Sequence, residues 1–409
     1  MTRPTKISMI AALLMGATVV NDAEAETVRI GFPVPLTGVV AESARDMVNG
    51  FQLYLDQHDG MLGGLEVELF IEDTEAIPQN ALTKARKLVE SDNVDFIVGF
   101  FLASEGLAVR DYAEENEIPL FLPIVSADDI TQRMRSPYIV RMIWTSSQVM
   151  HPFGEYAYNE LGYERIAVVG VDYAFGWETV GGFQTTFEEA GGEIVSKIWL
   201  PFDTSDYGSF AAQIPRDVDA VFSVLVGAHI PGFLRAYQDY GLQGSIPLIG
   251  ANVLTDEDVL RSMGDEALGV VTAHSYTASL ERPQNIAFVE AFNEEYGHNP
   301  SYYAEATYTA AMWIDRALAE TGMPTDPLAL VEAVRAVELL DAPRGPLRLD
   351  EYGNPIETIY IRETVVAEDG EGMENQVLHS IPEVSQFWTY SPEEFLSQPV
   401  YSRNYPPLQ

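Results

Sequence analysis

The sequence predicts an α/β fold built as two similar lobes, each with a parallel-type sheet covered by helices on both faces. From Val28 onward, apolar strand-like runs alternate with amphipathic helical runs. Strands separated by helices form parallel sheets whose crossover helices cover both faces. The alternation starts again near Tyr163, and 409 residues exceed one ordinary core, so we expect two lobes.

The first lobe is predicted from segments taken in chain order. The strand at Val28 runs into a Pro/Gly loop, and a helix follows with one apolar face: Ala44, Met47, Val48, Phe51 and Leu55. A strand over 63–73 leads to a helix over 77–92, with Pro78 in its first turn and Ala81, Ala85 and Leu88 facing inward. Strands over 94–101 and 118–125 flank the helix that follows Ser104.

The second lobe repeats the pattern. A strand over 165–172 precedes a helix that places Val180, Phe183 and Phe187 on one face. Further strands are expected over 191–200, 218–227 and 246–253. A helix is expected within the segment 231–242, with Gly241 as its stop, since glycine commonly ends helices.

Composition and the N-terminus limit the class of protein. The net charge of −39, from 62 acidic against 23 basic residues, repels nucleic-acid phosphates and anionic membranes. No cysteine is present, which excludes disulfides, thiol catalysis and a lipid anchor on cysteine. Arg3 and Lys6, the apolar run over 7–20 and the Ala23-Glu24-Ala25 site predict a signal peptide over 1–25. We therefore expect a soluble, exported protein cleaved after Ala25; a membrane anchor is the alternative.

Two neighbouring strands end in small residues. Phe101–Ser104 and Pro123–Ser126 follow successive strands of the first lobe, so they should lie side by side at one rim of the sheet. Ligands of open α/β sheets bind outside the carboxyl ends of strands, and small side chains let a ligand approach the backbone. We expect both strand ends to contact one small molecule.

Several segments resemble the leucine/isoleucine/valine-type (type I) periplasmic substrate-binding proteins of ABC importers. The matching blocks are IGFPVPLTGVVAESARDMVNGFQLYLD, EDTEAIPQNALTKARKLVESDNVDFIVG, DYAFGWETVGGF, YGHNPSYYAEATYTAAMWIDRAL and APRGPLRLDEYGNPIETIYIRE. The resemblance covers most of residues 27–365 and rests on the order and spacing of the blocks. It implies two Rossmann-like lobes joined by three crossover hinge segments, near Trp144, His274 and Leu347.

The resemblance also implies the domain organisation and the partners. Lobe 1 would comprise 26–144 and 275–346, lobe 2 would comprise 145–274 and 347–365, and 366–409 would pack on the surface, anchored by Phe387 and Trp388. Hinge closure would bury a small solute in the cleft. The partners would be that solute and the ABC permease subunits of the inner membrane, in the periplasm, with no nucleic acid and no cofactor; we expect a monomer.

Matching by motif assigns the site residues. Ala103 and Ser104 fall where the family holds a ligand carboxylate, Ser126 where it supplies a hydroxyl, and Phe175 where it places an aromatic lid. Asn252 falls where amino-acid binders place an acid for the ligand ammonium. A neutral amide suits a hydroxyl, amide or carboxylate better than a buried cation.

Aromatic residues add to this assignment. Trp144, Tyr173 and Phe175, with Phe101, would give the cleft an apolar lining, so a neutral or carboxylated solute such as an aromatic acid or amide is expected rather than leucine. Tyr173 and Phe175 are read as exposed aromatics before a loop glycine.

Structural alternatives stay open for most of these residues. Ser104 and Ser126 suit helix N-caps, Trp144 suits hinge packing, and Asn252 suits a turn. Glu105 or Asp172 is placed to reach a ligand ammonium from another position, which would restore a branched-chain amino acid binder.

Two other functions are weighed. An exported hydrolase would need a nucleophile with its base, and the sequence has no G-x-S-x-G motif and no paired histidines for zinc, so no enzyme, no catalytic residue and no metal is expected. A ligand-binding sensor for a membrane receptor uses the same fold and remains an alternative.

Overall fold

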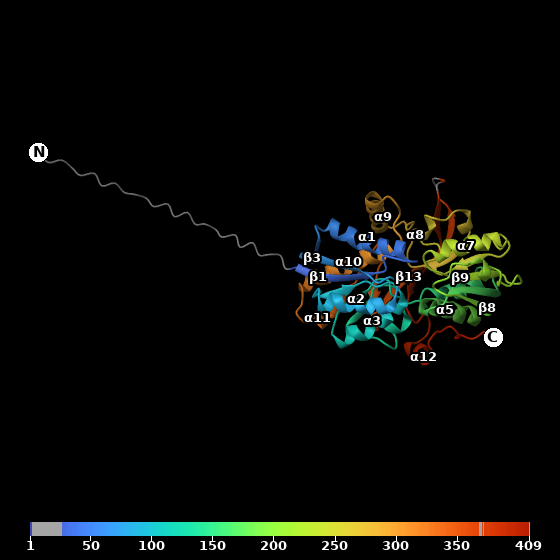
Figure 1. The fold of residues 1–409 in the computed structure, drawn as a ribbon, viewed down its shortest axis with the longest axis horizontal. Coiled ribbons are helices and arrows are strands. Elements are labelled where there is room, and N and C mark those ends of the chain that lie inside the picture. The colour runs from blue at the N-terminus through green and yellow to red at the C-terminus, as the bar shows by residue number, and fades with distance from the viewer. Residues whose placement is uncertain (2–26, 368–369, 371, 409) are drawn as a thin grey trace.

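The structure is a computed structural model that describes residues 1, 27–367, 370 and 372–408. The predicted signal peptide, apart from Met1, lies outside the described residues. The described chain forms two lobes that lie side by side, with the red C-terminal segment running beneath the second lobe (Figure 1). No helix in the described ranges combines the length and the apolarity needed to cross a bilayer.

The first lobe is built around a six-stranded sheet in the order β2-β3-β1-β4-β5-β6. Its pairs are parallel except the β2–β3 hairpin. The strands are β1 (Thr27–Val34), β2 (Met61–Leu62), β3 (Leu65–Asp73), β4 (Phe96–Val98), β5 (Leu120–Leu122) and β6 (Ile139–Arg141). The helical segments of this lobe are α1 (Ala41–Gln57), α2 (Pro78–Glu90), α3 (Ala103–Glu115), η1 (Asp128–Ile130), α9 (Pro283–Tyr296), α10 (Tyr302–Thr321) and α11 (Pro327–Ala336).

The second lobe is built around a larger sheet in the order β12-β13-β11-β10-β9-β7-β8, with β14 paired to β13. The strands are β7 (Arg165–Val171), β8 (Glu193–Leu200), β9 (Ala220–Val224), β10 (Leu248–Gly250), β11 (Val271–His274), β12 (Arg348–Leu349), β13 (Pro355–Val366) and β14 (Met373–Val384). The helical segments are α4 (Met150–Asn159), α5 (Ala174–Ala190), α6 (Gly208–Ala211), α7 (His229–Asp239), α8 (Glu257–Leu260) and η2 (Asp265–Ala267).

The second sheet is mixed, which the parallel pattern did not predict in full. Strands β7 to β11 pair in parallel, whereas β13 pairs antiparallel with β11, β12 and β14. For two of these pairs the reason is the length of the connection. The short links between β12 and β13 and between β13 and β14 allow hairpins but no crossover helix, so these strands run antiparallel.

The predicted apolar faces of the helices are in the core. Met47 and Phe51 of α1, Leu88 of α2, and Phe183 and Phe187 of α5 are all buried. The α/β architecture predicted from periodicity is therefore confirmed.

Gly50 also matters for the site, because a Cβ there would lie 2.0 Å from the carbonyl oxygen of Ala304. Because glycine has no Cβ atom, α10 can pack closely on α1 at this position.

The chain passes between the two sheets three times: after β6, after β11 and before β12. The residues expected at crossovers, Trp144, His274 and Leu347, lie in or beside these three connections. The rings of Trp144 and His274 meet edge to face with centroids 5.9 Å apart. The first two crossings therefore contact each other.

The segment after residue 366 does more than pack on the surface. It first adds β14 to the second sheet, and it then continues as an extended tail with the short helix α12 (Pro392–Ser397). Phe387 is buried and Trp388 is half-buried. The tail binds lobe 2 through carbonyl oxygens, because Lys197 Nζ donates to Pro406 O at 2.5 Å and Gln184 Nε2 donates to Pro407 O at 2.9 Å.

Candidate functional site

A small pocket lies between the lobes at the carboxyl ends of the central strands; we call it the interlobe pocket. Its lining residues come from both lobes and are mostly aromatic or aliphatic. They are Phe101, Ala103, Ile124, Ser126, Trp144, Tyr173, Phe175, Val226, Val253, Tyr302 and Tyr303. Five of the seven residues chosen from the sequence are among them, so the folded chain brings the two strand ends together as expected.

Strand β4 turns sharply before it reaches the pocket. Gly99 has φ +151° and Phe100 has φ +59°, both in the left-handed region. A Cβ at Gly99 would lie 2.6 Å from Pro33 O, and the Phe100 N–H donates to that same oxygen at 2.7 Å. This turn directs the chain into α3, so that helix begins at the pocket with Ala103.

The N-terminus of α3 is the polar end of the pocket. The N–H groups of the first residues of a helix have no intrahelical acceptor, and they carry the positive end of the helix dipole. Ala103, which is the first residue of α3, lines the pocket. This wall therefore favours a negative group on a ligand without presenting a charged side chain.

The acids that were considered as ammonium ligands have other partners. The fully buried carboxylate of Glu105 accepts hydrogen bonds from the backbone N–H groups of Leu102 at 2.9 Å and Phe101 at 3.1 Å. Burial raises the pKa of Glu105 above its usual value. Asp172 accepts from Trp177 Nε1 at 2.9 Å and from Arg403 Nε at 3.0 Å. Among the described residues, none that lines the pocket has a charged side chain.

Trp144 lies both at the hinge and in the lining of the pocket. It packs at the hinge against His274 and also against Tyr302, with ring centroids 5.7 Å apart, and it lines the pocket. Its side chain is 1% exposed, and its indole Nε1 has no hydrogen-bond partner among the described residues. An unsatisfied buried donor is costly, so an acceptor on a ligand would be favourable here.

Aromatic rings form most of the remaining wall. Phe101 stacks on Tyr303 with centroids 4.9 Å apart and planes inclined by 20°, and Tyr303 lies against Tyr302 at 4.2 Å. Burial raises the pKa of Tyr302 and of Tyr303 well above the usual value, so both phenols stay protonated and able to donate. The pocket thus combines flat apolar surfaces with neutral donors.

The structure places four side chains differently from the positions considered in the sequence. Tyr173 and Phe175 are not exposed: Tyr173 is half-buried and Phe175 is buried, because both rings pack into the interlobe pocket. Ser104 is the second residue of α3, behind Leu102 at the cap position, and it lies outside the pocket lining. Ser126 caps no helix; its hydroxyl oxygen accepts from Ser146 Oγ at 3.0 Å.

Asn252 is placed beside the pocket rather than in it. It is 1% exposed, its carbonyl oxygen accepts from Arg362 Nη2 at 2.5 Å, and Val253 lines the pocket in its place. Its amide nitrogen Nδ2 has no hydrogen-bond partner among the described residues. The position where the resemblance led us to consider an acid therefore carries a neutral side chain outside the pocket lining.

Sequence reasoning missed the two tyrosines at the start of α10. Tyr302 and Tyr303 follow Ser301, whose hydroxyl oxygen accepts from Ala304 N at 3.4 Å as the helix N-cap. The sequence signal available here was a serine cap followed by two aromatic residues. Such a signal predicts where a helix begins, but it does not predict that the two rings reach the pocket. The contact with the pocket depends on the packing of α10 against α1, about 250 residues earlier in the chain.

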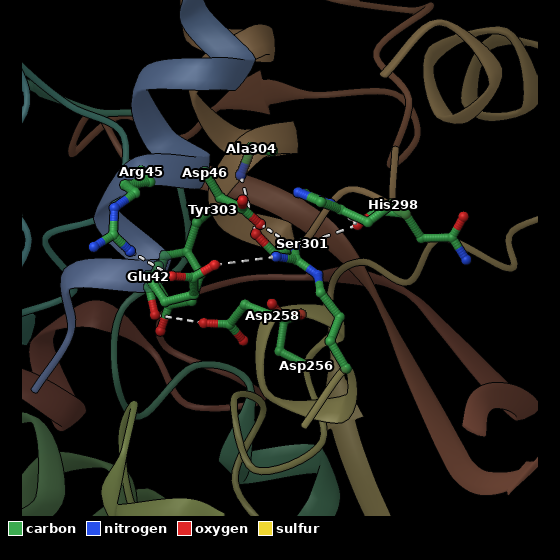
Figure 2. Close-up of polar contacts among 12 residues, drawn as sticks. Glu42, Arg45, Asp46, Asp256, Asp258, His298, Ser301, Tyr303 and Ala304 are labelled. Atoms are coloured by element: carbon green, nitrogen blue, oxygen red, sulfur yellow. Dashed lines mark hydrogen bonds and ion pairs between the residues drawn. The ribbon is translucent and has the colours of Figure 1, made fainter. Parts of the chain in front are cut away.

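The lobes contact each other around the pocket. Ser43 of α1 donates to Asp258 of α8, and Arg261 Nη2 pairs with Asp46 Oδ2 at 2.5 Å; Figure 2 shows Asp46, Asp258 and Tyr303 in this group of side chains. Elsewhere, Ala228 N donates to Val39 O at 3.1 Å, and Asp128 N donates to Glu178 Oε2 at 3.1 Å. These contacts hold the two lobes against each other.

The interlobe pocket is small with its lining side chains in the positions seen in this structure. Its volume is about 20 Å³, which is comparable to the space one water molecule needs. An organic solute therefore enters only if the lobes separate or the aromatic rings rotate.

The chain is similar to known proteins over most of its length. The model of a family described as "Periplasmic binding protein" matches residues 27–371. "Leu/Ile/Val-binding protein homolog 6" of Brucella melitensis is 30% identical over 369 residues, which are 88% of this chain and 93% of that protein.

Solved structures agree in fold. A solute-binding protein of an ABC transporter from Rhodopseudomonas palustris BisB5, in complex with 3,4-dihydroxybenzoic acid, has a TM-score of 0.83 and 31% identity, covering 88% of this chain and 98% of that one. Another from R. palustris, in complex with benzoate, has a TM-score of 0.82 and 27% identity, covering 88% and 97%. The chain belongs to the periplasmic binding protein family and is a substrate-binding protein of the ABC-transporter type.

Proposed function

We propose that this chain captures a small aromatic carboxylate between its lobes and delivers it to an ABC permease. One observation carries the proposal: the interlobe pocket is lined by aromatic rings and has the N-terminus of α3 and an unpartnered indole N–H in its wall. Flat rings stack on an aromatic body, and N–H donors at a helix start suit a carboxylate. The seven residues chosen from the sequence belong to this proposal, with Ser104 and Asn252 as neighbours of the pocket.

The charge of the pocket argues against a zwitterionic amino acid. A ligand ammonium would be buried against neutral groups, because neither Glu105 nor Asp172 lines the pocket. Burying a charge without a partner costs on the order of several kcal/mol. A benzoate-like anion needs no such partner, and its charge lies at the end of the pocket formed by α3.

The ligands of two structural relatives support the same class. The proteins from R. palustris hold 3,4-dihydroxybenzoic acid and benzoate, and they share the fold at TM-scores above 0.8. The name of the Brucella relative points instead to branched-chain amino acids. The aromatic lining of the interlobe pocket favours aromatic carboxylates over branched-chain amino acids.

The rest of the transport cycle follows from the family. The chain would be exported, cleaved after Ala25 and active as a monomer in the periplasm, where hinge closure buries the solute. The solute would be released unchanged to the permease, without catalysis. The alternative partner is a membrane sensor, which would recognise the same ligand-bound form of the chain.

Binding tests on the purified mature chain decide the ligand class. Calorimetry with benzoate, 4-hydroxybenzoate and 3,4-dihydroxybenzoate should show saturable binding. Methyl benzoate removes the charge and cyclohexanecarboxylate removes the aromatic ring, so each should bind at least ~tenfold more weakly. Saturation by leucine, isoleucine or valine, with no heat from the aromatic acids, would overturn the ligand class while leaving the transport role in place.

A further inference from the structure

A second cavity lies where the C-terminal tail crosses the two lobes; we call it the tail cavity. Its volume is about 230 Å³, far larger than that of the interlobe pocket. It is lined by four residues of the first lobe, by two of α5 and by tail residues between 390 and 405. The first six are Asp128, Asp129, Gln132, Arg133, Thr185 and Glu189. The two cavities share no lining residue, so a ligand here would be distinct from the transported solute.

The tail cavity has a negative wall. Asp128, Asp129, Glu189 and Glu394 line it, against the single guanidinium of Arg133. That guanidinium is already engaged, because it pairs with Asp129 at 2.8 Å and donates to Gln398 O at 2.9 Å. The remaining field favours a positively charged ligand.

Aromatic rings provide the other wall. Tyr390, Phe395, Tyr401 and Tyr405 line the cavity, and the rings of Tyr401 and Tyr405 are nearly parallel with centroids 6.3 Å apart. The faces of such rings attract cations, most strongly where water is excluded. Carboxylates combined with tyrosine faces form a typical site for an organic ammonium group.

Gln132 supplies an observation independent of the charges. Its side chain lines the cavity and is 2% exposed, and its amide nitrogen Nε2 has no hydrogen-bond partner among the described residues. The amide oxygen faces Arg133 Nη1 at 3.4 Å. A buried N–H left without an acceptor is unfavourable, so a ligand with a hydroxyl or carbonyl oxygen would satisfy it.

We propose that the tail cavity is a second ligand site, which binds a small organic cation that also carries a hydroxyl or carbonyl oxygen. The ammonium group lies among the carboxylates and tyrosine rings, and the oxygen accepts from Gln132. Because the cavity wall comes from both lobes and from the tail, the bound cation contacts all three.

Choline is a suitable probe because it combines a quaternary ammonium with a hydroxyl. Calorimetry on the full mature chain at constant ionic strength should show saturable binding of choline chloride. The neutral analogue 3,3-dimethylbutan-1-ol has the same shape without the charge and should not bind. Tetramethylammonium keeps the charge without the hydroxyl and should bind about threefold more weakly.

Matched variants test the assigned residues. Glu394 lines the cavity, whereas its neighbour Glu393 does not, and both are exposed on α12. Glu394→Gln should weaken choline binding about threefold, and Glu393→Gln should leave it unchanged. Tyr405→Leu should weaken it up to ~tenfold, with the exposed Tyr240→Leu as its control. Gln132→Leu should abolish the preference for choline over tetramethylammonium.

Three results would overturn the proposal. One is the absence of binding by both choline and ethanolamine up to ~10 mM, where a site with a Kd of about 1 mM would be filled. Another is equal binding of the neutral analogue. The third is an equal effect of Glu393→Gln and Glu394→Gln, because the charge of the cavity would then play no part.

Discussion

The interlobe pocket and the tail cavity differ in volume, in charge and in the way the chain builds them. The first has a volume of about 20 Å³, with no charged side chain among its described lining residues. The second has a volume of about 230 Å³ and is lined by four carboxylates. Strand ends and a helix start form the first, whereas an extended tail closes the second.

The two proposals together have one very acidic chain preparing one site for an anion and another for a cation. The net charge of −39 disfavours any anionic ligand at long range. At the interlobe pocket this is offset locally, because the acids near α3 are engaged with backbone and side-chain donors. At the tail cavity the guanidinium of Arg133 pairs with one of the four lining carboxylates, so the local charge stays negative and agrees in sign with the overall charge.

The largest expected effect comes from placing a carboxylate in the interlobe pocket. Ala103→Asp puts a negative charge where the ligand carboxylate would lie, and like charges at contact cost several kcal/mol. Benzoate affinity should fall about 100-fold or more in calorimetry, since 1.4 kcal/mol corresponds to about tenfold. Aspartate at a helix start is itself favourable, so folding should persist. Ala103→Ser is the control, and unchanged benzoate binding by the aspartate variant would refute the carboxylate position.

The next effect concerns the unpartnered donor in the pocket wall. Trp144→Phe keeps a ring but removes the indole N–H, so benzoate should bind about tenfold more weakly. Tyr276→Phe is the matched control, because the Tyr276 hydroxyl is also buried without a partner but lies outside the pocket lining. Choline binding should not change in either variant. Equal losses of benzoate affinity in both would show that the effect is structural.

A pH-dependent effect on stability is expected at Asp128, which lines the tail cavity. Burial raises the pKa of Asp128 from 3.8 to about 6, against the lowering effect of hydrogen bonds from Ser147 and the charge of Arg141. The carboxylate of Glu178 lies beside it, and burial also raises the pKa of that group. The folded state therefore binds the proton more tightly than the unfolded chain, so the free energy of unfolding falls as the pH rises from about 4 through about 6.

Asp128→Asn removes this contribution. Relative to the parent, the variant should gain about 2 kcal/mol in the free energy of unfolding at pH 7 compared with pH 4, since one pKa unit corresponds to about 1.4 kcal/mol. Urea denaturation at both pH values measures the difference. Parallel pH profiles for parent and variant would contradict the assignment.

The smallest effect concerns contact between the lobes. Ser43→Ala removes the hydrogen bond from α1 to Asp258 across the lobes and makes closure less favourable. Benzoate affinity should fall about threefold, in line with the loss of one hydrogen bond. Thr83→Ala, which removes a bond to Gln79 O within α2 of the first lobe, should leave it unchanged. A loss confined to Thr83→Ala would argue against closure through α1 and α8.

Local patterns predicted much of the fold and part of the site. Helical periodicity identified the buried faces of α1, α2 and α5, because one side of each helix must face the core. The rule that parallel strands share a carboxyl edge predicted that Ala103 and Ser126 would meet, and both line the interlobe pocket. It could not predict that Ser104 points elsewhere, since one residue along a helix turns the side chain by about 100°.

The sequence by itself determined the alternation of strands and helices, the large negative charge and the small residues at the strand ends, since these depend on composition and near neighbours. Only the tertiary structure decided that Tyr302 and Tyr303 complete the interlobe pocket, that Glu105 binds the backbone, and that tail tyrosines gather beside Gln132. These outcomes depend on packing between residues up to some 270 positions apart, and no local pattern encodes which surfaces meet.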